Sequence, residues 1–492
     1  MAAPLESPAD VAPPADRVRR AAEAWARVPL RRRLAVVRCF RDLLAREALA
    51  LVRAVPDGSR RAASDTLAGE LIPLAEACRF LEREAADILR PRRHGRRGRP
   101  AWLPGTALEL RREPLGVVLI LGAANYPLFL PGVQALQALV AGNGVLLKPG
   151  RGGRRAALAL RDLLWRAGLD PELLEVLPEE TAAARAALAS GIDRVLLTGS
   201  AATGREVLRD LADRLVPATL ELSGCDAVFV RPEADAELVA ASLCFGVGFN
   251  HGATCIAPRR VFVTRRRAAD LELALRRQFE AAPFRQAGGD VAEKIRRLIR
   301  EAVAAGARRV LPRHPDGAGP VLLAAVDPGM AVARADLFAP VLLLLPVDDM
   351  EEALRQDDRC PYALGASVFG DVGPARALAA RVQAGVVVVN DVIVPTADPR
   401  LPFGGRRESG FGVTRGAEGL REMTAIKAVA VRSPRRRRHL DAPRAGDGPL
   451  FEAWLRAAHA VGWLDRARGF RDLILAALRH GRSPIGEEEV QR

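Results

Sequence analysis

Two residues of this chain have the types and the spacing that thiol chemistry requires. Cys255 ends the segment FNHGATC, where small residues lead up to the thiol, and Glu221 begins the segment ELSG, 34 positions earlier. A free thiol has a pKa of about 8.5, so a catalytic cysteine depends on its surroundings for activation. A carboxylate can act as a general base beside such a nucleophile. We therefore expect Cys255 to be a nucleophile and Glu221 to be the base that serves it.

The use of lysine and asparagine sets a few positions apart. Among 74 basic residues only three are lysines, at positions 148, 294 and 427. Lysine is a compact point charge and arginine a broad planar fork, so a lysine kept in such a chain indicates a task that arginine cannot perform. The four asparagines all lie in segments singled out below, at positions 125, 143, 250 and 390.

The composition is that of a large protein with a basic surface. The chain has 492 residues, 49% of them apolar, and a formal net charge of +15. This length predicts two or three domains, and the apolar fraction predicts a large core. The arginines are spread along the chain with little aromatic interleaving. We interpret them as solvated surface and expect no specific nucleic-acid partner.

The cysteines and the N-terminus favour a cytoplasmic location. The six cysteines form no CxxC pair and show no zinc spacing, so we expect neither a disulfide scaffold nor a bound metal. Free thiols are typical of a reducing cytoplasm. Residues 1–16 lack the basic start and apolar core of a signal peptide.

The stretch 115–147 carries no charge and could be mistaken for a membrane span. Prolines and glycines interrupt it, and these residues end helices rather than continue them. We expect a strand at 115–121, a loop at 122–130, a helix at 131–141, a turn, and a strand at 145–148. Strands this apolar suit a sheet that is covered on both faces.

Strands and helices alternate from residue 115 onward, after a helical region at 17–90. This rhythm predicts a parallel, doubly wound sheet, to which we also assign strands at 173–177, 194–198 and 218–222. A second α/β unit begins near 224. Its expected strands are 227–230, 259–263, 341–346 and 384–390, and its expected helices are 235–247, 267–280, 290–305 and 349–356. Further strands are expected at 106–112 and 426–431, and two amphipathic segments at 450–480.

Several short motifs, taken in order, resemble the signatures of the aldehyde dehydrogenase superfamily. The resemblance runs from about 113 to 430 and includes Cys255 and Glu221 at the separation common in that family. The matching segments are EPLGVV (113–118), GAANYP (122–127), KP (148–149), LTGS (197–200), DLFAP (336–340) and LPFGG (401–405). The resemblance implies oxidation of an aldehyde to an acid through a cysteine thiohemiacetal and a thioester. Members that transfer the acyl group to coenzyme A generally lack the glutamate, so its presence favours the hydrolytic reaction.

The resemblance also implies roles for other residues. Asn125 would donate to the oxyanion together with the backbone N–H of Cys255. The cofactor would be NAD or NADP, bound by a set of residues that comprises Lys148, Gly199, Ser200, Gly204, Asp336 and Phe338. Gly199 and Gly204 would let a helix start approach the cofactor diphosphate.

Two of these positions depart from the family. Arg151 follows Lys-Pro-Gly where an acidic residue usually binds ribose hydroxyls, and an arginine there could pair with a 2′-phosphate, as in NADP. Asp336 stands where the family has a glutamate, so its shorter side chain puts its reach to the nicotinamide ribose in doubt.

The expected fold is α/β, with a doubly wound cofactor domain, an α/β catalytic domain and a small β flap for oligomerisation. The domains are 1–100 with 114–223 for NAD(P), 224–418 for catalysis, 101–113 with 419–433 for the flap, and 434–492 for a basic linker and helical appendage. By resemblance the flap would form a homodimer or homotetramer.

Two other interpretations remain open at this point. If 251–255 were helical, His251 and Cys255 would share a face and could form a thiol hydrolase pair. Alternatively, the chain could be a catalytically inactive binding or scaffold protein that uses its basic surface. The tail, with its arginine run at 435–438, permits membrane contact, although a packed helical appendage is the simpler interpretation.

Overall fold

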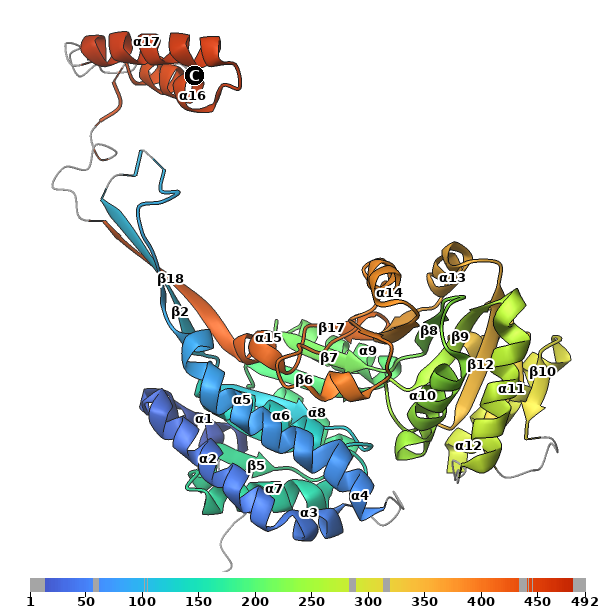
Figure 1. Cartoon of the computed structure of the whole chain (residues 1–492). Coiled ribbons are helices and arrows are strands. Elements are labelled where there is room, and N and C mark those ends of the chain that lie inside the picture. The colour runs from blue at the N-terminus through green and yellow to red at the C-terminus, as the bar shows by residue number, and fades with distance from the viewer. Residues whose placement is uncertain are drawn as a thin grey trace, which may run out of the picture. The chain divides into compact units, whose positions relative to one another are not determined.

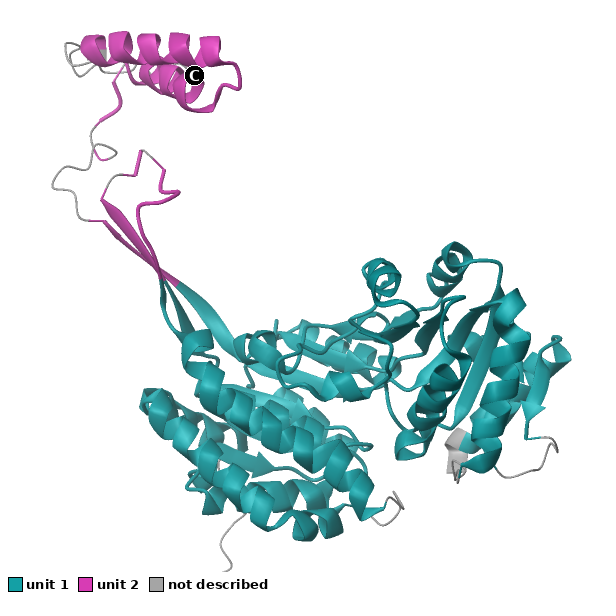
Figure 2. Cartoon of the chain, viewed as in Figure 1, with its two compact units in different colours: residues 1–92, 110–427 teal, residues 93–109, 428–492 magenta. Residues whose placement is uncertain are grey.

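The computed structural model describes residues 14–55, 62–100, 102–103, 105–282, 289–312, 319–432, 440, 442–444 and 446–480. The arginine run at 435–438 and the first 13 residues lie outside this set. The chain divides into two compact units, coloured separately in Figure 2. The first comprises residues 1–92 and 110–427, and the second comprises 93–109 and 428–492.

The first sheet of the larger unit is the predicted parallel, doubly wound sheet. Its strands from β7 to β5 are parallel, and only β17 pairs antiparallel at one edge. This arrangement confirms the predicted fold class. In spatial order the strands are β17 (Gly410–Phe411), β7 (Ala218–Leu222), β6 (Arg194–Gly199), β3 (Val117–Leu121), β4 (Gly144–Lys148) and β5 (Leu174–Val176).

Apolar residues on both sides of each strand place this sheet between two helical layers. In β3, Val118 and Ile120 pack into one core cluster, while Val117 and Leu119 pack into another on the opposite face. Successive strand residues point to opposite faces, so an all-apolar strand must be covered twice. The helices of the N-terminal half that flank the sheet are α1 (Pro14–Arg27), α2 (Leu30–Arg46), α3 (Ala48–Ala54), α5 (Ile72–Leu89), α6 (Phe129–Ala141), α7 (Arg154–Arg166), α8 (Thr181–Ala189) and α9 (Ala201–Ala212) (Figure 1).

The uncharged stretch folds as a strand, loop, helix and strand, as predicted. Helix α6 ends at Gly142, whose φ of +101° is the left-handed conformation that glycine adopts at helix C-termini. Its N-terminus is capped by Glu70, whose carboxylate accepts hydrogen bonds from the backbone of Leu128 and Phe129 at 2.7 and 3.1 Å. Across the described residues, the structure contains no helix with the length and apolarity needed to cross a membrane.

A second sheet follows Glu221 in the chain. Helices α10 and α11 contribute to the core on one face, and α12, α13 and α14 contribute to the core on the other (Figure 1). In spatial order its strands are β10 (Arg308–Leu311), β11 (Val321–Ala324), β12 (Val341–Val347), β9 (Pro258–Thr264), β8 (Asp226–Val230), β14 (Gly365–Phe369) and β15 (Val386–Val389). The helices are α10 (Ala236–Gly248), α11 (Arg265–Ala281), α12 (Gly289–Ala304), α13 (Met350–Asp357) and α14 (Val372–Ala379).

Three strands of this sheet were not predicted. Strands β10 and β11 are only four residues long. Strand β14 is fully buried between β8 and β15, so its sequence GASVF shows no alternation to reveal it. Buried pairing partners, rather than local sequence, make these segments strands.

The remaining elements are short connections, a small sheet and a helical pair. A sheet of order β1-β2-β18 contains β1 (Arg92–His94), β2 (Thr106–Pro114) and β18 (Thr424–Arg432). The predicted strands at 106–112 and 426–431 are therefore present. The tail forms α16 (Asp447–His459) and α17 (Trp463–His480), which pack against each other. The other short elements are α4 (Ala63–Thr66), α15 (Gly416–Glu422), β13 (Tyr362–Ala363), β16 (Arg406–Arg407), the π-helical turn Leu67–Leu71 and the 3₁₀ turns Pro171–Leu173, Phe249–Gly252, Ala331–Arg334 and Val394–Ala397.

Candidate active site

The carboxyl edge of the first sheet gathers many of the predicted site residues. Lys148 ends β4 and pairs with the last residue of β3, from which the Asn125 loop departs. Gly199 ends β6, and Glu221 lies at the end of β7 beside it. Because these strands are parallel, their carboxyl ends meet at one edge, which is where open α/β sheets bind ligands.

Cys255 follows a tight, left-handed turn. Asn250 and His251 have φ values of +50° and +54°, and Gly252 has φ of +76°. The segment Phe249–Gly252 is therefore a short turn with left-handed backbone at Asn250 and His251, and not an α-helix. The thiol hydrolase interpretation is wrong in its premise, because His251 and Cys255 do not occupy one helical face.

The turn before Cys255 is held against the segment that contains Asp336. A Cβ on Gly252 would lie 2.3 Å from the carbonyl carbon of Ala339, so only glycine fits there. The buried Arg259 donates to the carbonyl oxygens of Gly252 and Ala339, the latter at 2.7 Å. This arginine was not predicted as a site residue, and it fixes two loops of the site at once.

The Asn125 loop is joined directly to the cysteine turn. The Asn125 amide donates to the carbonyl of Ala253 at 2.9 Å, two residues before Cys255. Asn250 donates to the carbonyls of Asn125 and Ala253, both at 3.1 Å. The hydroxyls of Tyr126 and Thr254 lie 2.7 Å apart. The structure thus brings Asn125 next to the nucleophile segment, and its role as an oxyanion donor stays a prediction.

Glu221 is buried and incompletely satisfied. Its side chain is 2% exposed, and Thr414 donates its hydroxyl to Oε2 at 3.1 Å. Within the described residues, Oε1 has no hydrogen-bond partner. Burial raises the pKa of Glu221, while Arg415 and the Thr414 hydroxyl act in the opposite direction. A carboxylate with a raised pKa suits a general base near neutral pH.

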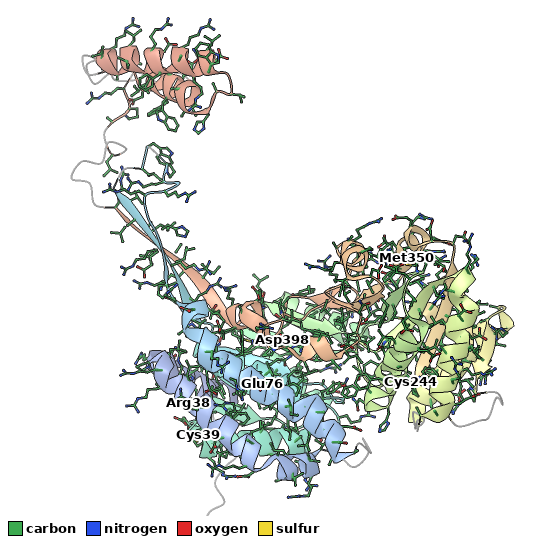
Figure 3. All side chains as sticks on the ribbon, in the orientation of Figure 1. Arg38, Cys39, Glu76, Cys244, Met350 and Asp398 are labelled. Atoms are coloured by element: carbon green, nitrogen blue, oxygen red, sulfur yellow. The ribbon has the colours of Figure 1, made fainter. Side chains whose placement is uncertain are left out.

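Cys255 and Glu221 line the same cavity, which has a volume of about 380 Å³. Burial raises the pKa of the Cys255 thiol, and the carboxylates of Glu221 and Asp226 add to this effect, while Arg415 opposes it. Cys39 lies on α2 and Cys244 on α10 (Figure 3), and neither lines this cavity. Of the six cysteines, Cys255 alone lines it.

A buried arginine completes this cavity. Arg415 is 6% exposed and donates to the carbonyl of Thr396 at 2.7 Å. Its guanidinium lies over the ring of Phe403, 4.3 Å from the centroid, and 5.5 Å from that of Phe129. The sequence analysis did not identify Arg415 or the neighbouring Thr414. Both follow the LPFGG signature but match no motif, and one arginine does not stand out in a chain with so many.

The predicted cofactor residues form a second cluster along the same edge. Lys148 is half-buried; burial lowers its pKa, while Glu179 and Glu180 act to raise it. Ser200 caps the N-terminus of α9, accepting from the Thr203 N–H at 3.2 Å. A Cβ on Gly204 would lie 2.9 Å from the Leu222 side chain. Packing therefore explains the glycine at position 204, because the absence of a side chain lets α9 lie close to β7. The end of β4 and the start of α9 offer a cation and N–H donors of the kind that bind a dinucleotide.

The other three positions differ in their surroundings. Arg151 is exposed in the turn after β4, and the neighbouring Gly152 N–H donates to Glu179 at 2.9 Å. Phe338 is half-buried in the segment that Arg259 anchors. Burial raises the pKa of Asp336, which is hydrogen-bonded to Ser223. Asp336 therefore lies within reach of the segment that begins at Glu221.

Comparison with known proteins places this arrangement in a family. Residues 1–429 match the model of the "Aldehyde dehydrogenase family". The chain is 29% identical over 429 residues to 4,4'-diapolycopene aldehyde oxidase of Methylomonas sp, covering 85% of this chain and 81% of the relative. It is 29% identical over 471 residues to a Mycolicibacterium smegmatis protein named "Putative succinate-semialdehyde dehydrogenase [NADP(+)]", covering 91% and 89%. It also resembles the crystal structure of Mycobacterium tuberculosis aldehyde dehydrogenase complexed with NAD+, with a TM-score of 0.78 and 27% identity over 84% of this chain and 88% of that one. The chain belongs to the aldehyde dehydrogenase family.

Proposed function

We propose that this protein oxidises an aldehyde to a carboxylic acid with NAD or NADP, using Cys255 as nucleophile. The observation that carries the proposal is the shared cavity of Cys255 and Glu221, with Asn125 hydrogen-bonded to the turn that precedes Cys255. The thiol adds to the aldehyde carbon and forms a thiohemiacetal. The Asn125 amide and the Cys255 N–H stabilise the oxygen as it gains negative charge.

A nicotinamide cofactor, when bound, supplies the hydride acceptor that converts the thiohemiacetal to a thioester. Lys148 and the start of α9 would hold it, with Asp336 and Phe338 on the nicotinamide side. A relative named for NADP(+) and a neighbour crystallised with NAD+ support either cofactor.

Glu221 then takes the proton of the water that attacks the thioester. Its buried position keeps the carboxylate weakly solvated, so its raised pKa makes it a better proton acceptor. Its Oε1 lacks a hydrogen-bond partner within the described residues, which leaves a lone pair for that water.

Two variants test these roles separately. Glu221→Gln should release about one equivalent of NAD(P)H per site in a burst and then nearly stop, because the thioester forms but is not hydrolysed. Cys255→Ala should give neither burst nor turnover, whereas Cys39→Ala, at an exposed position of α2, should match the wild type. Undiminished turnover in Cys255→Ala would refute the proposal.

Arg151 supports acceptance of NADP. It is exposed after β4, where a planar guanidinium can pair with a 2′-phosphate. The ratio of kcat/KM for NADP and NAD should fall about tenfold or more in Arg151→Ala, while Arg83→Ala on α5 should leave it unchanged. A strong wild-type preference for NAD would end this assignment.

We also infer a homodimer or homotetramer formed through β2 and β18. Strand β18 is a sheet edge within the described residues, and Ile426 is 62% exposed on it; such edges readily pair with another chain. We retain the predicted domain division, with this sheet as the flap. The six unpaired thiols support a reducing cytoplasm. Light scattering on wild type and Ile426→Lys tests the assembly, and an unchanged mass would contradict it.

A further inference from the structure

The cavity beside Cys255 contains a positive charge that the proposed reaction does not use. Its walls are mainly apolar and include Phe129, Phe249, Phe403 and Ile393. Arg415 is the one cationic side chain among the described residues that line it. Burying a charge among apolar groups is costly unless the charge is paired, so a guanidinium here calls for an explanation.

Arg415 is only partly satisfied by the protein. It makes one hydrogen bond, to the Thr396 carbonyl, and stacks on Phe403. Within the part of the chain that the structure describes, Arg415 forms no ion pair, and its buried Nε has no hydrogen-bond partner. The protein thus orients the guanidinium plane, while N–H groups of Arg415 remain without an acceptor among the described residues.

Glu221 does not accept a hydrogen bond from Arg415 in this structure. Arg415 and Glu221 influence each other electrostatically, since each shifts the pKa of the other towards the charged form. They are not in salt-bridge contact, however, and Glu221 is hydrogen-bonded to Thr414 instead. Pairing the general base with arginine would also weaken it as a proton acceptor, so the site keeps the two apart.

We propose that Arg415 binds a carboxylate on the substrate, so that the preferred substrates are aldehydes bearing a carboxylate on an apolar or aromatic spacer. This inference rests on the proposed function. The planar fork of arginine matches a carboxylate in two parallel hydrogen bonds. The carboxyl groups of Glu221 and Asp65 also line the cavity, so the feature that favours a substrate carboxylate is the hydrogen-bonding fork of Arg415 and not the net charge of the cavity. The aromatic walls match the spacer, with the aldehyde directed to Cys255.

The names of the relatives do not decide this point, so the test uses matched substrates. Wild-type enzyme is assayed with 4-formylbenzoate and its methyl ester, and with 4-oxobutanoate and its methyl ester. Charge-assisted hydrogen bonds of this kind are worth about 10- to 100-fold in binding. We expect kcat/KM for at least one acid to exceed that of its ester by about tenfold or more. Esters that match or exceed both acids would overturn the inference.

Variants then assign the preference to this residue. In Arg415→Met, the acid-to-ester ratio of kcat/KM should fall about 10- to 100-fold, and Arg415→Lys should retain part of it. Arg400→Met is the matched control, because it removes one exposed arginine of the same loop that is paired with Asp398 and does not line the cavity. Its ratio should equal that of the wild type.

The alternative role for Arg415 is to favour the ionised forms of Cys255 and Glu221. In that case Arg415→Met would slow acids and esters equally and leave the ratio unchanged, which would refute carboxylate binding. Because the wild-type comparison needs no variant, poor folding of Arg415→Met cannot hide the answer. Turnover of the esters alone would preserve the proposed function and refute only this inference, whereas absence of NAD(P)H with every aldehyde would refute the proposed function itself.

Discussion

Removing the hydroxyl of Thr414 should reduce the fraction of Glu221 that is ionised at low pH, so the loss of activity should depend on pH. Thr414→Val is nearly isosteric, and it deletes the one side-chain hydrogen bond that Glu221 makes among the described residues, at 3.1 Å to Oε2. That bond stabilises the ionised carboxylate, so it lowers the pKa of Glu221 against the raising effect of burial. Without it the pKa rises further, and the acid limb of the kcat profile moves to higher pH.

The size of the effect follows from the geometry. A hydrogen bond to a charged group contributes about 1.5–3 kcal/mol, which corresponds to roughly 10- to 150-fold. The Thr414 hydroxyl has one hydrogen and two acceptors, because the carbonyl of Phe403 lies 3.2 Å away. Sharing places the effect at the low end. We expect about a tenfold loss below both pKa values and little loss on the high-pH plateau.

The assay must isolate the step that Glu221 serves. Pre-steady-state release of NAD(P)H reports thioester formation, and the following steady state reports hydrolysis. Thr414→Val should enlarge the burst at low pH, and Thr414→Ser, which keeps the hydroxyl, should behave as wild type. Identical acid limbs and identical bursts in Thr414→Val and wild type would show that this hydroxyl does not act on the base.

Two further predictions concern what holds the site. Gly252→Ala should lower activity strongly and destabilise the fold, because its Cβ meets the Ala339 carbonyl carbon at 2.3 Å; Gly168→Ala, also at positive φ but in open space, should cost only about 1–2 kcal/mol in urea unfolding. Equal costs would contradict the close approach. Asp357→Ala should cost about 3–5 kcal/mol by leaving Arg260 buried without its partner at 2.7 Å, whereas Asp348→Ala, which breaks an exposed pair with Arg265, should leave the stability nearly unchanged. Similar melting temperatures for both variants would refute this reasoning.

The sequence was most informative where local pattern and global fold agree. The strands that begin at Val117 and Gly144 were foreseen because each is an apolar run bounded by glycine or proline. The buried strand Gly365–Phe369 escaped notice, because small residues and a serine give it no period. Its state is set by β8 and β15, which are distant in the chain.

The site shows the same division. Cys255 and Glu221 lie in short sequence motifs that can be recognised without the structure, and both line the same cavity. Arg259 and Arg415 could not be foreseen, because their importance lies in burial and in the carbonyls they reach, at Ala339 and Thr396. Because nearly all basic residues of this chain are arginines, the residue type alone could not identify these two as part of the site.

The return of β17 to the first sheet has a consequence for synthesis. Gly410 pairs with Glu221, and the partner of the Glu221 carboxylate lies only four residues further on. The ribosome has therefore delivered both large sheets almost entirely before the final pieces of the reactive centre emerge. A nascent chain halted near position 400 would hold its thiol and its carboxylate without the edge strand that braces them. Such a chain would lack a complete active site. We therefore expect activity to appear only after the segment that contains β17 and Thr414 has been synthesised.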